Sequence, residues 1–123
     1  MIKDFAYKWL PIVFGCHCRE DRTLYYKGNK FPICARCTGE LVGIILACFM
    51  YHFIKINLVW LLLIMIPMLL DGFIQLLTKY ESNNSKRFIT GLLFGISLSY
   101  LFIGSVINVY HSGYSFGYRL INR

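Results

Sequence analysis

Apolar and polar positions are segregated along this chain. After a polar segment rich in cysteine come three apolar stretches, at about residues 39–54, 58–78 and 88–110, which are almost free of charged residues. A helix that crosses a membrane needs about 20 mostly apolar residues, because the hydrocarbon core is about 30 Å thick. The pattern therefore predicts three transmembrane helices.

The segments outside these stretches are expected to lie at the membrane surface. Residues 1–15 contain an apolar run that is too short to cross the bilayer, which indicates an interfacial segment. The tail, residues 111–123, mixes glycine, serine and aromatic residues and is also interpreted as interfacial. Residues 16–38 form a polar loop, in which the Lys-Gly-Asn-Lys turn signal at 27–30 predicts a small hairpin.

Small residues recur every four positions in the first and third apolar stretches. Such stripes let two helix backbones approach closely in lipid. We therefore expect the first and third helices to touch along them. The stripes consist of Gly39, Gly43 and Ala47 in the first stretch, and Gly91, Gly95 and Ser99 in the third.

Composition supports a membrane protein. Hydrophobic residues make up 57% of the 123 residues and charged residues only 15%, which is too apolar for an ordinary soluble domain. A soluble bundle of buried helices would need far more polar surface. We therefore expect a single all-α integral membrane domain, in contact with the lipid bilayer.

The distribution of charge predicts the topology. A net charge of +7 would suggest nucleic acid for a soluble protein, but in a membrane protein lysine and arginine first report orientation, so no nucleic-acid partner is expected. Five basic residues lie in residues 16–40 and three in residues 79–87, against Lys55 alone in the turn between the first two spans. The positive-inside rule then places both basic segments in the cytoplasm of a multi-pass cell-membrane protein, where thiols stay reduced.

Four of the five cysteines form two close pairs in the polar loop. Cys16 and Cys18 form a C-x-C pair, and Cys34 and Cys37 form a C-x-x-C pair. Four thiolates in such pairs are typical of a closed tetrahedral zinc site, so zinc is the expected cofactor, with His17 as a substitute ligand. The alternative is thiol redox chemistry by the same cysteines.

The second apolar stretch contains a carboxylate. Pro67, Asp71 and Gln75 follow one another at intervals of four residues and therefore share one face of a helix. A carboxylate inside a membrane is costly and marks a functional site by default. An ion pair that holds the helices together would also explain it, so both interpretations require a partner, and the shared face favours a pocket.

Further polar residues are expected at the same side of the membrane as Asp71. Arginines bind phosphate or carboxylate groups through forked donors, and a carboxylate beneath them could act as a base. We expect a pocket for an anionic, lipid-like ligand, with Asp71 and Glu81 as candidate catalytic residues. Alternatively, the arginines only hold acidic residues and the anionic lipid surface. The candidate ligand-binding residues are Arg19, Arg22, Arg36, Gln75, Asn83 and Arg87.

Four sequence blocks together resemble a known family. They read GCHCRxDR at residues 15–22, FPICARCTG at 31–39, LLDGFIQ at 69–75 and ESNNxxRFITGLLFG at 81–95. These blocks resemble the domain-of-unknown-function 2085 family of small predicted membrane proteins. The resemblance implies a membrane protein and supplies no activity.

The leading functional hypothesis combines the two groups of residues. It is a zinc-bearing membrane protein whose polar pocket binds an anionic, lipid-like ligand, with catalysis left open. Two alternatives from other classes are a membrane thiol-disulfide oxidoreductase and a structural subunit that docks a partner protein or a second copy of the chain.

Overall fold

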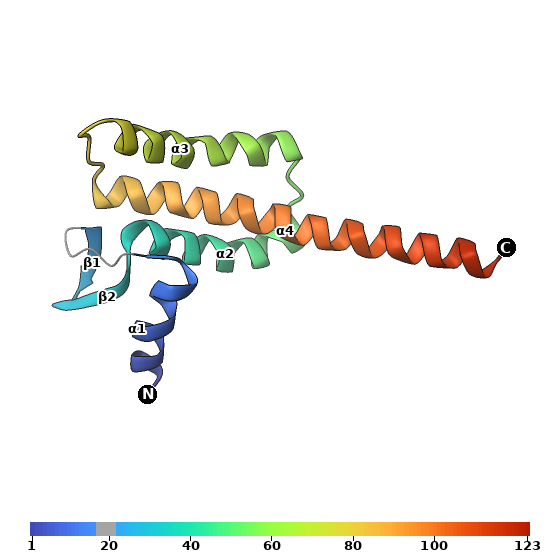
Figure 1. The fold of residues 1–123 in the computed structure, drawn as a ribbon, viewed down its shortest axis with the longest axis horizontal. Coiled ribbons are helices and arrows are strands. Elements are labelled where there is room, and N and C mark those ends of the chain that lie inside the picture. The colour runs from blue at the N-terminus through green and yellow to red at the C-terminus, as the bar shows by residue number, and fades with distance from the viewer. Residues whose placement is uncertain (17–21) are drawn as a thin grey trace.

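The computed structural model describes residues 1–16 and 22–123, and this part of the chain is mostly helical. Figure 1 shows α1 and a β-hairpin at one end, and three long helices that run side by side from there. The elements are α1 (Ile2–Val13), β1 (Thr23–Tyr26), β2 (Asn29–Cys34), α2 (Ala35–Phe53), α3 (Leu58–Leu77) and α4 (Asn84–Ile121). The mainly helical fold agrees with the sequence, and the two-stranded sheet is the hairpin that the turn signal predicts.

The hairpin turns over two residues whose backbone is left-handed. Lys27 has a φ of 49° and Gly28 a φ of 79°. Such values are typical of the tight turns whose twist matches that of two antiparallel strands. β1 and β2 pair antiparallel, with Thr23 opposite Cys34. The turn thus brings Cys34 back beside Thr23, at the start of the hairpin.

α2 and α4 pack so closely that their backbones touch. On each helix two glycines leave no room for a side chain, Gly39 and Gly43 on α2 and Gly91 and Gly95 on α4. A Cβ atom on Gly91, for example, would overlap the carbonyl oxygen of Arg36. The contact expected between the first and third apolar stretches is therefore confirmed.

α4 also packs against α3, so that it lies between α2 and α3 (Figure 1). At the end of the bundle remote from the hairpin, Tyr100 packs against Ala47 and Leu61. The Tyr100 hydroxyl donates a hydrogen bond of 3.0 Å to the carbonyl oxygen of Ile54. Tyr51 contacts the Tyr100 ring edge-on, with centroids 5.2 Å apart. This cluster joins α2, α3 and α4 at the end of the bundle remote from the hairpin.

Two helices, α3 and α4, are long and apolar enough to cross a membrane. Large apolar side chains along α3 are exposed, which is typical of a surface that faces lipid. They include Leu62, Leu63, Ile66, Leu69, Leu70 and Phe73. α2 has 19 residues but does not meet the same criterion, so the third span stays a prediction, as does the cytoplasmic position of the loop.

α4 differs from the helix expected at residues 88–110. It begins at Asn84 and continues through the expected tail to Ile121, over 38 residues. A helix of this length measures about 57 Å, well beyond the thickness of a hydrocarbon core. The tail contains no proline, and single glycines weaken a helix without ending it. The interfacial position of the tail was inferred from composition alone, which does not exclude a helix.

α1 runs across the direction of the three long helices (Figure 1). It packs against β2, and the Tyr7 hydroxyl donates a hydrogen bond to the carbonyl oxygen of Lys30. Several of its apolar side chains, among them Phe5 and Trp9, are exposed. A helix placed in this way suits an interface, which remains the expectation for residues 1–15.

Candidate metal centre and polar cluster

Three of the four loop cysteines meet beside the start of α2. Cys16 follows α1, Cys34 ends β2, and Cys37 lies in the first turn of α2. Their sulfur atoms all lie within 4.8 Å of one another, and all three residues are half-buried. Four sulfurs at 2.3 Å from a tetrahedral zinc ion would be about 3.8 Å apart. The three cysteines could therefore hold a metal ion, while Cys18 and His17 lie outside the described residues.

The local hydrogen bonds favour a thiolate at Cys34. The backbone N–H of Cys34 donates to the sulfur of Cys16 at 3.3 Å, and the sulfurs of Cys34 and Cys37 are 3.4 Å apart. The pKa of the Cys34 thiol falls from 9.0 to about 5, because Cys37 hydrogen-bonds the thiolate and the backbone N–H groups of Cys37 and Arg36 stabilise its charge. The pKa of Cys37 is raised, because its proton is shared with Cys34. One sulfur is thus ready to bind a cation at neutral pH, and binding would release the shared proton.

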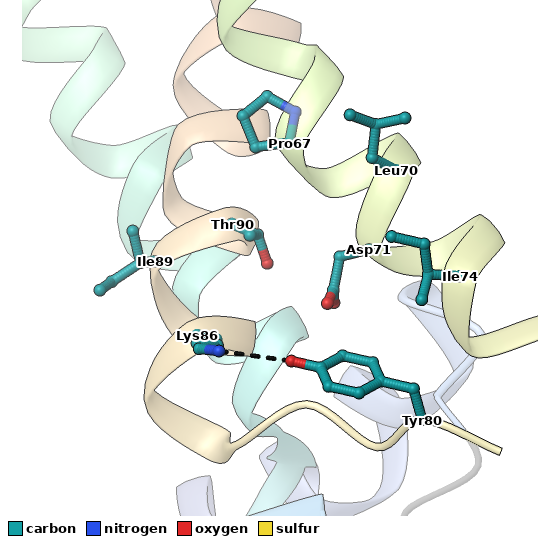
Figure 2. A pocket seen from close by; sticks show the side chains of 8 residues that line it. All are labelled: Pro67, Leu70, Asp71, Ile74, Tyr80, Lys86, Ile89 and Thr90. Atoms are coloured by element: carbon teal, nitrogen blue, oxygen red, sulfur yellow. Dashed lines mark hydrogen bonds between the residues drawn. The ribbon is translucent and has the colours of Figure 1, made fainter. Parts of the chain in front are cut away.

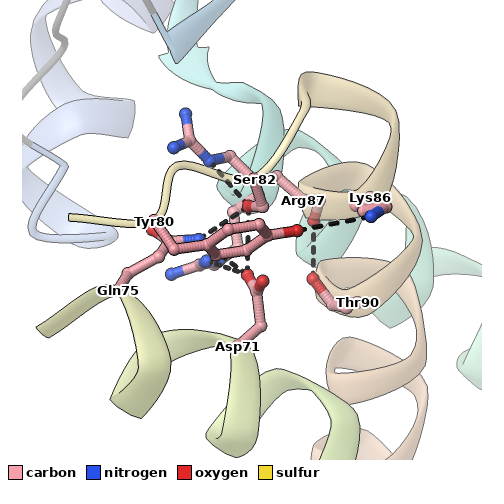
Figure 3. Close-up of polar contacts among 8 residues, drawn as sticks. Asp71, Gln75, Tyr80, Ser82, Lys86, Arg87 and Thr90 are labelled. Carbon is pink, nitrogen blue, oxygen red and sulfur yellow. Dashed lines mark hydrogen bonds and ion pairs between the residues drawn. The ribbon is translucent and has the colours of Figure 1, made fainter. Parts of the chain in front are cut away.

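A second group of polar residues surrounds Asp71 on α3, as Figure 3 shows. The Asp71 carboxylate oxygen Oδ2 accepts three hydrogen bonds. The donors are Arg36 Nη2 at 2.6 Å, Gln75 Nε2 at 2.9 Å and Ser82 Oγ at 3.2 Å. The Arg36 and Asp71 side chains are 23% and 14% exposed. The partner that the sequence required for Asp71 is therefore Arg36, with Gln75 and Ser82 as neutral donors.

Ser82 connects this group to the start of α4. Its hydroxyl oxygen accepts hydrogen bonds from Gln75 Nε2 at 2.6 Å and from Arg87 Nε at 3.2 Å. Arg87 is only 5% exposed, so its side chain is covered by the surrounding residues of the bundle. We call the five residues Arg36, Asp71, Gln75, Ser82 and Arg87 the Asp71 cluster. The cluster joins α2, α3, the loop after α3, and α4.

The other candidate residues that the structure describes are Arg22, Glu81 and Asn83. Arg22 pairs with Glu81 at 3.5 Å, and the Glu81 side chain is 70% exposed. Asn83 is the N-cap of α4 but makes no side-chain capping hydrogen bond. Arg19 lies outside the described residues. Asp71 and Glu81 each pair with a different arginine, and a catalytic role for either stays a prediction.

An open groove runs between α3 and α4 next to Asp71, shown in Figure 2. Its volume is about 630 Å³. One part is apolar and the other carries polar groups, among which Lys86 Nζ donates to the Tyr80 hydroxyl at 3.3 Å. The lining residues are Pro67, Leu70, Asp71, Ile74, Tyr80, Lys86, Ile89 and Thr90.

The group of three cysteines and the Asp71 cluster are linked through Arg36. This residue lies between Cys34 and Cys37 in the sequence, and its guanidinium reaches Asp71 on another helix. Sequence reasoning identified Arg36, Asp71, Gln75 and Arg87, but it missed Ser82. A serine in a polar loop does not by itself indicate a functional residue. The position of Ser82 within the ESNN block was the only indication in the sequence.

The chain is similar to two archaeal proteins. It is 41% identical over 92 residues to an uncharacterized protein of Methanothermobacter thermautotrophicus. The aligned region covers 70% of this chain and 82% of that protein. It is also 37% identical over 90 residues to an uncharacterized protein of Methanocaldococcus jannaschii. Here the aligned region covers 68% of this chain and 58% of that protein. No solved structure matches the chain.

A family model describes most of the same region. The model for predicted membrane proteins of the DUF2085 family matches residues 16–101. This range contains the cysteine loop, α2, α3 and the part of α4 that packs against them. It also contains every residue of the Asp71 cluster. The chain belongs to the DUF2085 family of predicted membrane proteins.

Proposed function

We propose that this protein is a zinc-bearing membrane protein that binds an anionic, lipid-like ligand at the metal-bearing end of its helical bundle. The observation that carries the proposal is the meeting of three cysteine sulfurs within 4.8 Å. Cys18 completes the tetrahedron, or His17 in its place. The metal holds the hairpin against the start of α2, and through Arg36 it fixes the geometry of the Asp71 cluster.

The hairpin needs such support because it has little apolar core. Among the described residues of 16–34, Ile33 is the single hydrophobic residue that is buried. Structural zinc supplies roughly 10–16 kcal/mol of apparent binding free energy in small modules, which is ample to fold a polar loop.

The proposed topology has three spans with the metal centre in the cytoplasm. α2 serves as the first span because it packs along α4 through backbone contacts of the kind that membrane helices use. The starts of α2 and α4 and the end of α3 lie at one end of the bundle (Figure 1). The two basic segments therefore share one side, as the positive-inside rule requires.

The ligand occupies the groove between α3 and α4. Its acyl chains lie along the apolar part, next to Leu70, Ile74 and Ile89, and its anionic head lies near the ammonium of Lys86. Arg36 and Arg87 are engaged by Asp71 and Ser82. Their positive charges therefore attract the anionic head of the ligand at a distance, without direct contact.

Thiol-disulfide exchange is a second candidate, which one observation favours. Cys34 and Cys37 sulfurs are 3.4 Å apart, and a thiol whose pKa is about 5 at a helix start is typical of reactive C-x-x-C pairs. In this reaction the Cys34 thiolate and the Cys37 thiol would form a disulfide, releasing the one proton that the pair holds and passing two electrons to a disulfide or quinone acceptor.

Metal analysis of the detergent-purified protein separates the two candidates. We expect one zinc ion per chain, lost in Cys34→Ser and in Cys37→Ser. Cys48→Ser is the matched control, because Cys48 is exposed on α2 and should leave the metal content unchanged. A metal-free protein with a Cys34–Cys37 disulfide, or equal metal content in all three variants, would overturn the zinc proposal.

The ligand is tested on the same preparations by mass spectrometry of bound lipids. Ile89→Trp fills the groove and should remove the bound anionic lipid. Ile45→Trp places the same ring on the exposed surface of α2, away from the groove, and should retain it. Equal lipid content in the two variants, with metal content intact, would contradict the ligand and leave the metal centre standing.

A further inference from the structure

A second cleft lies between α1 and the hairpin, away from the groove and the Asp71 cluster. Its volume is about 390 Å³. Lys3 and Tyr7 of α1 form one wall. The other wall is formed by the hairpin residues Tyr26, Lys27, Asn29, Lys30, Phe31 and Pro32.

The cleft is positively charged. Three lysines line it, and no described residue that lines it carries a carboxylate. The ammonium of Lys27 lies 5.7 Å from the centre of the Tyr26 ring, which holds the charge near the aromatic wall. Lysine ammonium groups next to tyrosine rings suit a phosphate group at the level of lipid headgroups.

α1 presents opposite faces to the hairpin and to its surroundings. Lys3 and Tyr7, one helical turn apart, face the cleft. The residues on the opposite side of the helix are apolar and exposed, namely Ile2, Phe5, Trp9, Ile12 and Val13. An amphipathic helix of this kind lies in the interface with its apolar face in the acyl region and its basic side among headgroups.

The direction of α1 agrees with this placement. α1 runs across the axes of α3 and α4 (Figure 1), the two helices long and apolar enough to cross a membrane. When these helices cross the bilayer, α1 lies along its surface at the end that carries the hairpin. The cleft is then at headgroup level.

We propose that the cleft between α1 and the hairpin binds the phosphate headgroup of an anionic phospholipid and so fixes α1 on the membrane surface. The proposal rests on the membrane-spanning bundle of the proposed function. It is independent of the groove between α3 and α4. In the proposed function the metal supports the hairpin, which forms one wall of this cleft.

The test uses Trp9 as a reporter in the full chain. The chain has two tryptophans, so Trp60→Phe leaves Trp9 as the single fluorophore. The protein is placed in phosphatidylcholine nanodiscs that contain an equal small fraction of brominated phosphatidylglycerol or brominated phosphatidylcholine. We expect stronger quenching of Trp9 by the brominated phosphatidylglycerol, because the cleft enriches the anionic lipid beside α1.

Two matched double variants test whether the cleft causes the stronger quenching of Trp9 by the anionic lipid. Lys3→Gln with Lys27→Gln removes two lining charges and should abolish the difference between the two quenchers. At about 1 kcal/mol per lysine this corresponds to a loss of about thirtyfold in affinity. Lys8→Gln with Lys55→Gln removes the same charge outside the cleft and should retain the difference.

Three outcomes would overturn the inference. One is equal quenching by the two lipids in the unmodified chain, and another is an equal loss in both double variants. In the third, inorganic phosphate at constant ionic strength removes the difference in Trp9 quenching between the two brominated lipids. That result would identify the cleft as a site for a free anion. Zinc content and insertion are measured on the same samples, so a failure of the proposed function is recognised separately.

Discussion

At the scale of single residues, Asp71 holds the polar end of the bundle together. Its carboxylate accepts hydrogen bonds from Arg36, Gln75 and Ser82, which belong to three different parts of the chain. Both members of the Arg36–Asp71 ion pair are largely buried. Removing one member would leave the other as a largely buried charge without its partner.

Asp71→Asn is therefore expected to destabilise the protein. The asparagine amide still offers an acceptor but no charge to balance Arg36, and the loss of one partner of a buried pair costs about 3–5 kcal/mol. The free energy of unfolding in detergent measures the effect. Asp4→Asn is the control, because Asp4 is 90% exposed in its ion pair and such pairs contribute about 0–1 kcal/mol.

The Arg36→Met/Asp71→Leu double variant distinguishes an ion pair from two separate roles. If the pair is the cause, replacing both residues should cost less than replacing either alone, because no charge is left buried. Additive losses in the double variant would show that Arg36 and Asp71 stabilise the bundle through different contacts.

Only some of the residues around Asp71 could be predicted from the sequence. An apolar stretch with one carboxylate demands a partner, so the need for an arginine was predictable. The choice of Arg36 was not, because it depends on how α2 and α3 are placed on the two sides of α4. Ser82 was missed for the same reason, since only the packed structure brings its hydroxyl between Gln75 and Arg87.

At the scale of elements, the contact between α2 and α4 organises the bundle. It was predictable because a helix places every fourth residue on one face, so that glycines at this spacing form a smooth stripe. The length of α4 was not predictable. Composition distinguishes lipid-facing from interfacial residues, but it does not show where a helix ends when no proline or capping residue follows.

Gly91→Ala tests the closeness of this contact. The new Cβ would meet the backbone of Arg36, and overpacking of this kind costs about 1–3 kcal/mol. Gly113→Ala, on the same helix, has no atom within 4 Å of its new Cβ and should be neutral or stabilising by about 0.5–1 kcal/mol. Unfolding of both variants is measured in the same detergent. Equal stability of the two would contradict the backbone contact.

At the scale of the whole molecule, one end of the bundle concentrates the chemistry. The cysteine sulfurs, the Asp71 cluster and the basic cleft beside α1 all lie at the end where α2 and α4 begin, while Tyr100 packs against Ala47 and Leu61 toward the other end. The sequence predicted this asymmetry from the order of its polar and apolar segments. It could not predict that Arg36 connects the cysteine group to the Asp71 cluster, because this connection arises from a contact between two helices.

The central claim is that the cysteine loop is closed by a thiolate-bound metal. X-ray absorption at the zinc edge of the purified protein tests it most directly. We expect three or four sulfur atoms at about 2.3 Å from the zinc, with one nitrogen if His17 replaces Cys18. A shell of oxygen and nitrogen with fewer than three sulfurs, or a protein that holds no zinc under reducing conditions, would contradict it.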